Sequence, residues 1–240
     1  MRTATLWVGW SLPLLSVLAI IVWELGLLDV ETLKAWQTLV AGVLAIVAAC
    51  IGAVAVVCQT KSQERREREI ALAKFDAELA FLTVSLKDLI QYADESGSYL
   101  KWAWHHTRTS IVRTPPPFPH VAVQSLVQLI EAAPDRAIRK AATHLIRKLQ
   151  VQNARLGGVD PLVKSALTPS YLHTTLALWV VDTAEVYSLI GEFFRFAREE
   201  TKQPRLSFRQ AQIVEGANMI GFDVSIEPEV FKRVEARFPT

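Results

Sequence analysis

Two carboxylates in the C-terminal half of the chain are spaced for acid–base chemistry. Asp182 and Glu185 lie three residues apart in a strongly apolar stretch, so a helix would place both on one face. Two like charges buried together repel each other, which raises the pKa of at least one of them, as in a general acid. The competing interpretation is that one carboxylate faces water or pairs with a basic residue. The sequence favours this second interpretation, because acids are seldom buried unless they are paired.

The other residue types that carry catalysis or metal binding lack the necessary spacing. The sequence contains no G-x-S-x-G, H-E-x-x-H, G-x-x-x-x-G-K-[ST] or G-x-G-x-x-G motif. Cys50 and Cys58 lie in an apolar segment, where a thiolate is unfavourable. No two of the five histidines are four residues apart. The sequence therefore assigns no catalytic residue, no metal ligand and no cofactor.

A basic stretch between residues 135 and 155 is the clearest candidate for binding. Asp135 is its only acid. The stretch predicts a helix with a buried apolar stripe at Ile138, Ala142, Leu145 and Leu149. The neighbouring cationic face could bind an anionic partner, such as lipid headgroups, a nucleotide, nucleic acid or an acidic protein. The candidate residues are Arg136, Arg139, Lys140, Arg147 and Lys148.

The same cations could instead be solvated, or could pair with acids further along the chain. The acids available for this are Asp182, Glu185, Glu192, Glu199 and Glu200. The formal net charge of the whole chain is +2 at pH 7, so there is no strong case for nucleic-acid binding. The sequence does not identify a small-molecule ligand.

The N-terminal quarter of the chain contains two long apolar segments. No charged residue occurs at residues 4–23 or 35–60, and all nineteen residues from 40 to 58 are apolar. A helix needs about 20 such residues, at about 1.5 Å each, to cross a hydrocarbon core of about 30 Å. Residues 1–60 are therefore predicted to form a transmembrane helical hairpin with spans at about 5–24 and 36–58.

The flanks of the two segments predict the orientation of this hairpin. The connector at residues 24–34 holds three acids and one lysine, whereas Lys61, Arg65, Arg66 and Arg68 follow the second segment. Basic flanks stay in the cytoplasm. We therefore expect an integral protein of a bacterial inner (plasma) membrane with both termini in the cytoplasm. A cleaved signal peptide is the competing interpretation of the first segment, but its apolar run is too long for one.

Small residues recur along the second span and could pack helices together. Ala41, Ala45, Ala49 and Ala53 are spaced by four residues, and Ala48 with Gly52 adds a second small pair. Such a face lets two helix backbones approach closely in lipid. The sequence leaves open whether this face packs on the first span or on another chain.

Residues 61–113 are predicted to contain a long stalk helix and an aromatic–basic segment. The stalk carries a heptad seam at Leu72, Phe75, Leu79, Leu82, Leu86 and Leu89. This seam could pack on its own domain or form a self-associating coiled coil. Trp102 and Trp104 follow it, and we expect both to pack on the stalk or the bundle, because a straight stalk would carry them far from the bilayer.

The remainder of the chain is predicted to be a proline-rich linker, residues 114–120, and a helical bundle, residues 121–240. No sustained alternation of apolar and polar residues indicates a sheet, so the predicted fold class is all-α. Pro134 would lie in the first turn of the basic helix, and a helix from about 170 to 200 would be central to the bundle. Its acids argue against the alternative of a third span.

Two further expectations concern the C-terminal helices. Ser207 and Gln210 would form a capping box for a helix that ends at Gly221. A last helix would start near Pro228 and bury Phe231, Val234 and Phe238.

These features favour a membrane-anchored, non-enzymatic scaffold or adaptor whose cytoplasmic helical domain binds a partner. Its partners would be the lipid bilayer and either a second copy or another protein. Two alternatives stay open. One is a membrane-permeabilising or channel-like effector gated by its cytoplasmic domain, although the second span has no polar stripe to line a pore. The other is a membrane-bound enzyme without a known signature.

Overall fold

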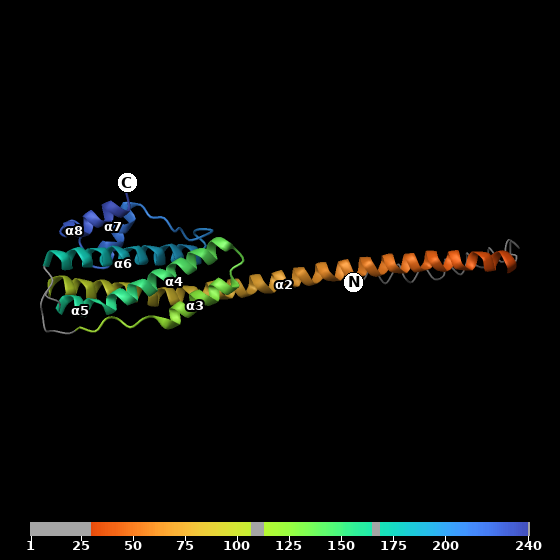
Figure 1. The fold of residues 1–240 in the computed structure, drawn as a ribbon, viewed down its shortest axis with the longest axis horizontal. Helices are drawn as coiled ribbons and strands as arrows, with labels where there is room; N and C mark the ends of the chain where they lie inside the picture. The colour runs from red at the N-terminus through yellow and green to blue at the C-terminus, as the bar shows by residue number, and fades with distance from the viewer. Residues whose placement is uncertain (1–29, 107–112, 165–168, 240) are drawn as a thin grey trace. The chain divides into compact units, whose positions relative to one another are not determined.

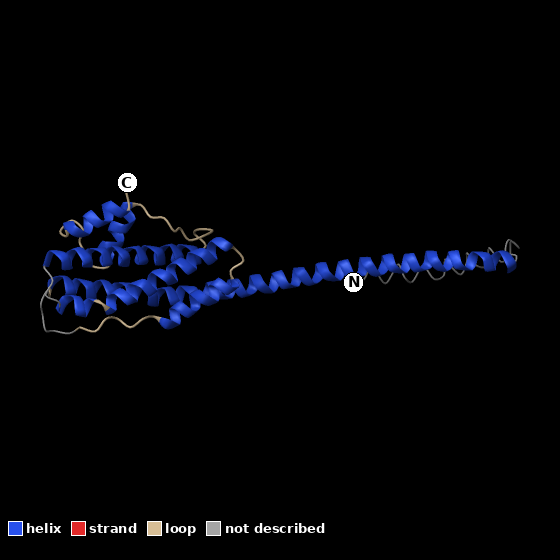
Figure 2. Cartoon of the chain, viewed as in Figure 1, coloured by secondary structure: helices blue, strands red, loops and turns tan. Residues whose placement is uncertain are grey.

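The computed structural model describes residues 30–106, 113–164 and 169–239, and its regular structure is helical throughout (Figure 1, Figure 2). No strand occurs in these three ranges, which confirms the predicted all-α class. The helices are α2 (Val30–His105), α3 (His120–Ala132), α4 (Arg136–Gly157), α5 (Val159–Lys164), α6 (Pro169–Ala197), α7 (Gln210–Met219) and α8 (Pro228–Arg237).

The chain divides into two compact units, Met1–Arg66 and Glu67–Thr240. In the first unit, every residue of α2 from 41 to 58 is exposed. Among the described residues, α2 is the one helix that is long and apolar enough, by length and composition, to cross a membrane. The predicted first span, at residues 5–24, lies outside the described residues. The second unit contains the second part of α2, from Glu67 to His105, together with the remaining helices, and is called the helical domain below.

The second part of α2 runs antiparallel to α3 and α6 in the helical domain. Phe75 lies against Phe196 near the end of α6, with ring centroids 6.5 Å apart, whereas Trp104 stacks on His173 near the start of α6 at 4.6 Å. The Ser85 hydroxyl donates a hydrogen bond to the Ser125 hydroxyl of α3 at 2.8 Å. One face of this part of α2 is therefore packed against the domain.

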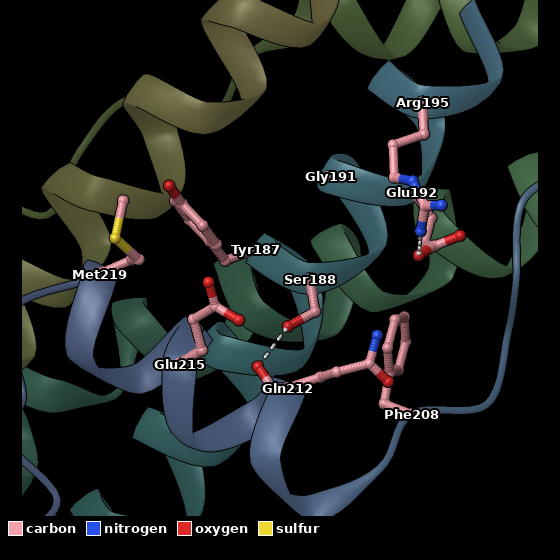
Figure 3. Close-up of a pocket in the computed structure, with 10 residues that line it drawn as sticks. Tyr187, Ser188, Gly191, Glu192, Arg195, Phe208, Gln212, Glu215 and Met219 are labelled. Atoms are coloured by element: carbon pink, nitrogen blue, oxygen red, sulfur yellow. Dashed lines mark hydrogen bonds and ion pairs between the residues drawn. The ribbon is translucent and has the colours of Figure 1, made fainter. Parts of the chain in front are cut away.

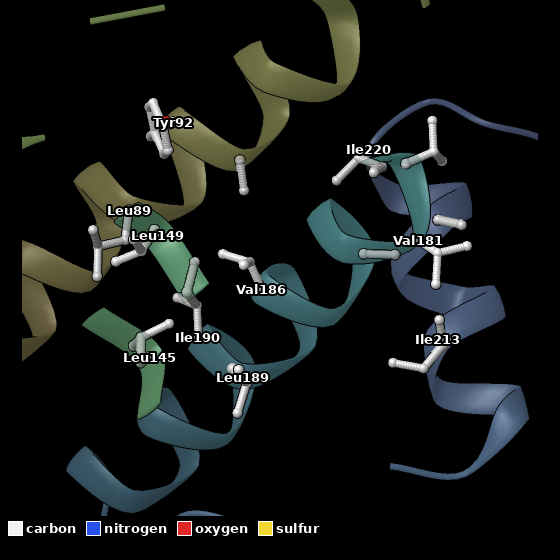
Figure 4. Close-up of a cluster of buried hydrophobic side chains, with 14 of the residues drawn as sticks. Leu89, Tyr92, Leu145, Leu149, Val181, Val186, Leu189, Ile190, Ile213 and Ile220 are labelled. Atoms are coloured by element: carbon white, nitrogen blue, oxygen red, sulfur yellow. The ribbon is translucent and has the colours of Figure 1, made fainter. Parts of the chain in front are cut away.

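The core of the domain is built from apolar stripes on α2, α4, α6 and α7. Leu145 and Leu149 on α4 are fully buried, as predicted from their spacing. Figure 4 shows how side chains from α2, α4 and α6 converge: Leu89, Tyr92, Leu145, Leu149, Val186 and Ile190. Burying apolar side chains at this density is the main favourable contribution to folding such a domain.

Two glycines allow helices to approach closely at the edge of this core. A Cβ atom on Gly216 of α7 would lie 2.8 Å from the Ala184 carbonyl oxygen and 2.8 Å from the Ser188 hydroxyl of α6. A Cβ atom on Gly97 of α2 would lie 2.3 Å from the carbonyl oxygen of Ile220. No side chain larger than hydrogen fits at either position without a shift of the backbone.

The observed helix ends correct two predictions. Pro134, which was expected in the first turn, lies before α4, and Asp135 is the N-cap, with its Oδ1 accepting a hydrogen bond from the Ala137 amide at 2.8 Å. The N-cap of α7 is Arg209, whose amide donates to Gln212 Oε1 at 3.0 Å, so the predicted box at Ser207 and Gln210 is wrong.

The C-terminal features were predicted in part. Gly221, with φ of +92°, follows α7 in the left-handed conformation that suits the end of a helix. On α8 the buried residues are Val230 and Val234, whereas Phe231 is 40% exposed, so its predicted burial is wrong. The side chain of Phe238 is partly buried against the core.

The first residue of the predicted stalk seam is exposed to solvent, and its last residues are buried in the core. Leu72 is 51% exposed, Phe75 and Leu79 are partly buried, and Leu82, Leu86 and Leu89 are fully buried in the domain core. The last three are thus covered by their own domain and are not available to a second chain. Trp104 is also buried and Trp102 packs against the same core, so the prediction for these two rings is confirmed.

Candidate functional site

Asp182 and Glu185 are positioned by α6 and are almost entirely enclosed, with side chains 10% and 8% exposed. Both are paired with cations, as the favoured interpretation of the sequence requires. Lys148 Nζ lies 2.7 Å from Glu185 Oε2, and Arg155 pairs with Asp182. Both cations come from α4, which runs antiparallel to α6. The carboxylates therefore connect two helices, and neither is free to act as a general acid or base.

A third cation reaches the same two carboxylates from the end of α8. Arg237 Nη1 donates to Asp182 Oδ1 at 2.6 Å, and Arg237 Nη2 donates to Glu185 Oε2 at 2.5 Å. A planar guanidinium suits this double contact, because its two nitrogens have a fixed separation. The contact holds the C-terminal helix against α6.

A cavity of about 470 Å³ opens beside this ion-pair cluster. Each of its positions on α4 lies three or four residues from another of them, so they share one face of that helix. We call it the cationic cavity. It is lined by His144, Arg147, Lys148, Val151, Arg155, Leu178, Asp182 and Arg237.

Positive charge predominates in the cationic cavity. Burial and the neighbouring Arg237 guanidinium lower the pKa of Arg155. The pKa of the His144 imidazole is also lowered, first by burial and then by neighbouring cations, of which Lys148 is foremost. Both shifts show that an additional positive charge is unfavourable here.

The structure divides the predicted basic set into two groups. Arg147 and Lys148 line the cationic cavity, whereas Arg136, Arg139 and Lys140 are exposed on α4 outside its lining. His144 and Arg155 belong to the basic stretch that the sequence singled out, although they were not among the five candidate residues, whereas Arg237 was not predicted to lie near this site. No local pattern around Arg237 indicated its partners.

A second concave surface lies between α6 and α7, with a volume of about 330 Å³. We call it the acidic groove. Gly216 brings α7 against α6 near Ser188, whose hydroxyl donates to the Gln212 carbonyl at 3.3 Å (Figure 3). At Gly191, in contrast, a Cβ atom would meet nothing within 4 Å, so this part of the groove is open. Phe208 and Met219 contribute apolar walls.

One carboxylate oxygen in the acidic groove lacks a partner. Glu192 is 4% exposed, and its Oε1 accepts a hydrogen bond from Arg195 at 3.1 Å. Its Oε2 is buried and has no hydrogen-bond partner among the described residues. A buried oxygen of this kind is costly unless a donor reaches it.

Other groups near the acidic groove add negative charge. Glu215 lines it, and burial together with the carboxylates of Asp94 and Glu215 raises the pKa of the Tyr187 phenol. Burial also raises the pKa of Asp94. Two carboxylates in the lining, Glu192 and Glu215, outnumber its one cation, Arg195, so the groove favours a cation, whereas the cationic cavity favours an anion.

The small residues of the predicted membrane face are exposed on α2. A Cβ atom on Gly52 would meet nothing within 4 Å among the described residues. The residues of this face are Ala41, Ala45, Ala49, Gly52 and Ala53. No group of three or more His, Cys, Asp or Glu side chains that could hold a metal ion occurs in the described ranges.

Comparison with known proteins gives no relative: no protein-family model, no curated protein and no solved structure matches this chain.

Proposed function

We propose that the protein is a membrane-anchored, non-enzymatic adaptor. The apolar part of α2 would hold it in the bilayer, and the helical domain would bind a partner at the cytoplasmic surface. The exposure of every residue from 41 to 58 carries this proposal. An apolar helix surface of this extent is unfavourable in water, whereas lipid tails provide an apolar environment for it. A helix can enter that environment because its backbone hydrogen bonds are made within the helix itself.

The acidic groove is the surface that we assign to the partner. Its occupant would be a protein segment with a lysine or arginine side chain, because a cation would complete the hydrogen bonding of Glu192 Oε2. Phe208 and Met219 would contact the aliphatic part of that side chain. A bilayer anchor raises the local concentration of a membrane-bound partner, so a groove of modest size suffices.

Reporter fusions test the anchoring half of the proposal. A reporter that is active only in the cytoplasm should work when fused after Thr240, and a reporter at Asp29 should report the opposite side of the membrane. A cytoplasmic signal at Asp29 would contradict the two-span topology.

Filling the acidic groove tests the binding half. Leucine at Gly191 would occupy the open part of the groove, and Gly157→Leu is the matched control because a Cβ atom there also meets nothing within 4 Å. In detergent extracts of the host membrane, Gly191→Leu should lose a co-purifying protein that Gly157→Leu retains.

A photo-crosslinker identifies the segment that occupies the groove. Benzoylphenylalanine at Met219, which is 60% exposed, should attach to a peptide that contains lysine or arginine. Equal retention by the two glycine variants, or a cross-linked segment without a basic residue, would contradict this docking site.

A further inference from the structure

We propose that the cationic cavity between α4, α6 and α8 is a binding site for an organic phosphate monoester. This inference does not depend on the proposed adaptor function, because it concerns a different surface of the helical domain. It rests on the number of cations that two helices, α4 and α8, direct into one cavity beside α6.

The cations outnumber the carboxylates that neutralise them. Four basic side chains line the cavity: Arg147, Lys148, Arg155 and Arg237. Two carboxylates, Asp182 and Glu185, accept all the ion pairs found at the cavity. The cluster therefore carries two positive charges more than negative charges, in a place where burial already disfavours the charged form of Arg155. A dianion would neutralise this excess.

Phosphate is the group that fits these donors best. The Lys148 ammonium has three hydrogens and gives one ion pair, to Glu185. Arg147 is exposed on the same face of α4, and no ion pair fixes its guanidinium among the described residues. Arginine and lysine together are the usual ligands of phosphate oxygens, and a phosphate monoester carries about −1.5 to −2 charge at pH 7.

The remaining walls indicate an organic substituent on the phosphate. Val151 is 47% exposed and Leu178 is 36% exposed, and both line the cavity. The volume of about 470 Å³ is much larger than one phosphate ion requires. It lies within the range of roughly 300–1,000 Å³ that is typical of small-molecule sites. The two apolar side chains would contact the substituent, so inorganic phosphate should bind less tightly than a monoester.

Phosphate monoesters reach a membrane protein from two sources, the cytosol and the lipid surface. Calorimetric titration of the full chain in phosphatidylcholine nanodiscs separates them. Adenosine 5′-monophosphate represents the soluble source, with adenosine as its control. Dihexanoyl phosphatidic acid represents the lipid headgroup, with dihexanoyl phosphatidylcholine as its control. Saturable binding of either monoester, without binding of its control, supports the site. Binding of adenosine 5′-monophosphate alone indicates a soluble ligand, and binding of dihexanoyl phosphatidic acid alone indicates a lipid headgroup.

Charge variants decide whether the binding occurs in this cavity. Val151→Glu places a carboxylate in the wall, and Gln150→Glu adds the same charge at the next position, which is exposed and outside the lining. Val151→Glu should weaken monoester binding by about tenfold or more, whereas Gln150→Glu should change it little. Arg147→Gln should weaken it by about tenfold, because it removes a charged donor without breaking an ion pair.

Three outcomes would overturn the proposal. They are no saturable binding of either monoester at millimolar concentration, equal weakening by Val151→Glu and Gln150→Glu, and binding of inorganic phosphate as tight as that of the monoesters. Circular dichroism of each variant at 222 nm, compared with that of the unmodified chain, confirms that the domain is folded before binding is measured.

Discussion

The two parts of helix α2 are both rich in apolar residues, but the described residues cover only one of them. From residue 41 to residue 58 every position is exposed. Further along the same helix, Leu82, Leu86 and Leu89 are fully buried in the helical domain. The apolar residues of the first part surround the helix, whereas those of the second part form a stripe with three- and four-residue spacing.

This difference shows that periodicity, rather than apolar content, indicates what a helix contacts. A stripe can be covered by neighbouring helices of the same domain, and polar residues on the other side remain in water. A helix that is apolar on all sides needs an apolar environment on all sides, and a bilayer supplies one. Substitutions in the second part should therefore change the stability of the domain, and substitutions in the first part should not.

The largest expected effect is the loss of a buried ring in the second part. Trp104 is 7% exposed, stacks on His173 and makes an edge contact with Phe222. Trp104→Ala should lower the free energy of unfolding of the domain by about 3–5 kcal/mol. The measurement is urea unfolding of the full chain in detergent micelles, followed by circular dichroism. Ile51→Ala in the first part is the control and should leave the transition unchanged. A similar loss from both variants would contradict the comparison.

A pair of glycines on the same helix gives a smaller and sharper contrast. Gly97→Ala should destabilise the domain by about 1–3 kcal/mol, because the added methyl group would lie 2.3 Å from the Ile220 carbonyl oxygen. Gly52→Ala adds the same methyl group where no described residue lies within 4 Å and should not affect unfolding of the domain. Thermal unfolding of the two variants in the same detergent makes the comparison. If Gly97→Ala is as stable as Gly52→Ala, the close contact between α2 and Ile220 is wrong.

The smallest expected effect on domain stability comes from the small-residue face. Ala45→Leu combined with Ala49→Leu should leave the unfolding transition unchanged, because both residues are exposed in the first part of α2. If this face packs between chains, the double variant should form smaller oligomers in detergent, measured by light scattering coupled to chromatography. An unchanged oligomer size would favour packing of the face on the first span.

The sequence predicted those parts of the fold in which local spacing determines the contact. The apolar stripe of α4 at Leu145 and Leu149 and the course of α6 as one helix both follow from residues three and four apart. The ends of helices were predicted less well, since α4 begins at Arg136 with Asp135 as its N-cap, whereas Pro134 was expected in the first turn. Both residues suit a helix start, and only the hydrogen bond to Ala137 distinguishes them.

The candidate sites depended on contacts that no local pattern contains. The basic stretch of α4 was evident, but Arg237 lies 55 residues after Asp182 in the sequence, and its position is set by the packing of α8 on α6. The acidic groove likewise depends on Gly216, which brings α7 against α6. A glycine within a helix indicates a close approach only when its neighbour in space is known.

The chain's own cysteines allow the most direct test of the membrane anchor. Cys50 lies within the exposed apolar part of α2, and Cys58→Ser leaves it as the single cysteine of the chain. A nitroxide attached to Cys50 in lipid vesicles reports, by power-saturation spectroscopy, its collisions with oxygen, which dissolves in lipid, and with a nickel chelate, which stays in water. A nitroxide at the exposed Lys74, in a chain without the native cysteines, is the aqueous control. A membrane span predicts frequent collisions with oxygen and few with the nickel chelate at Cys50. Frequent collisions with the nickel chelate, or few with either reagent, would contradict it, because residue 50 would then lie in water or inside a protein interface.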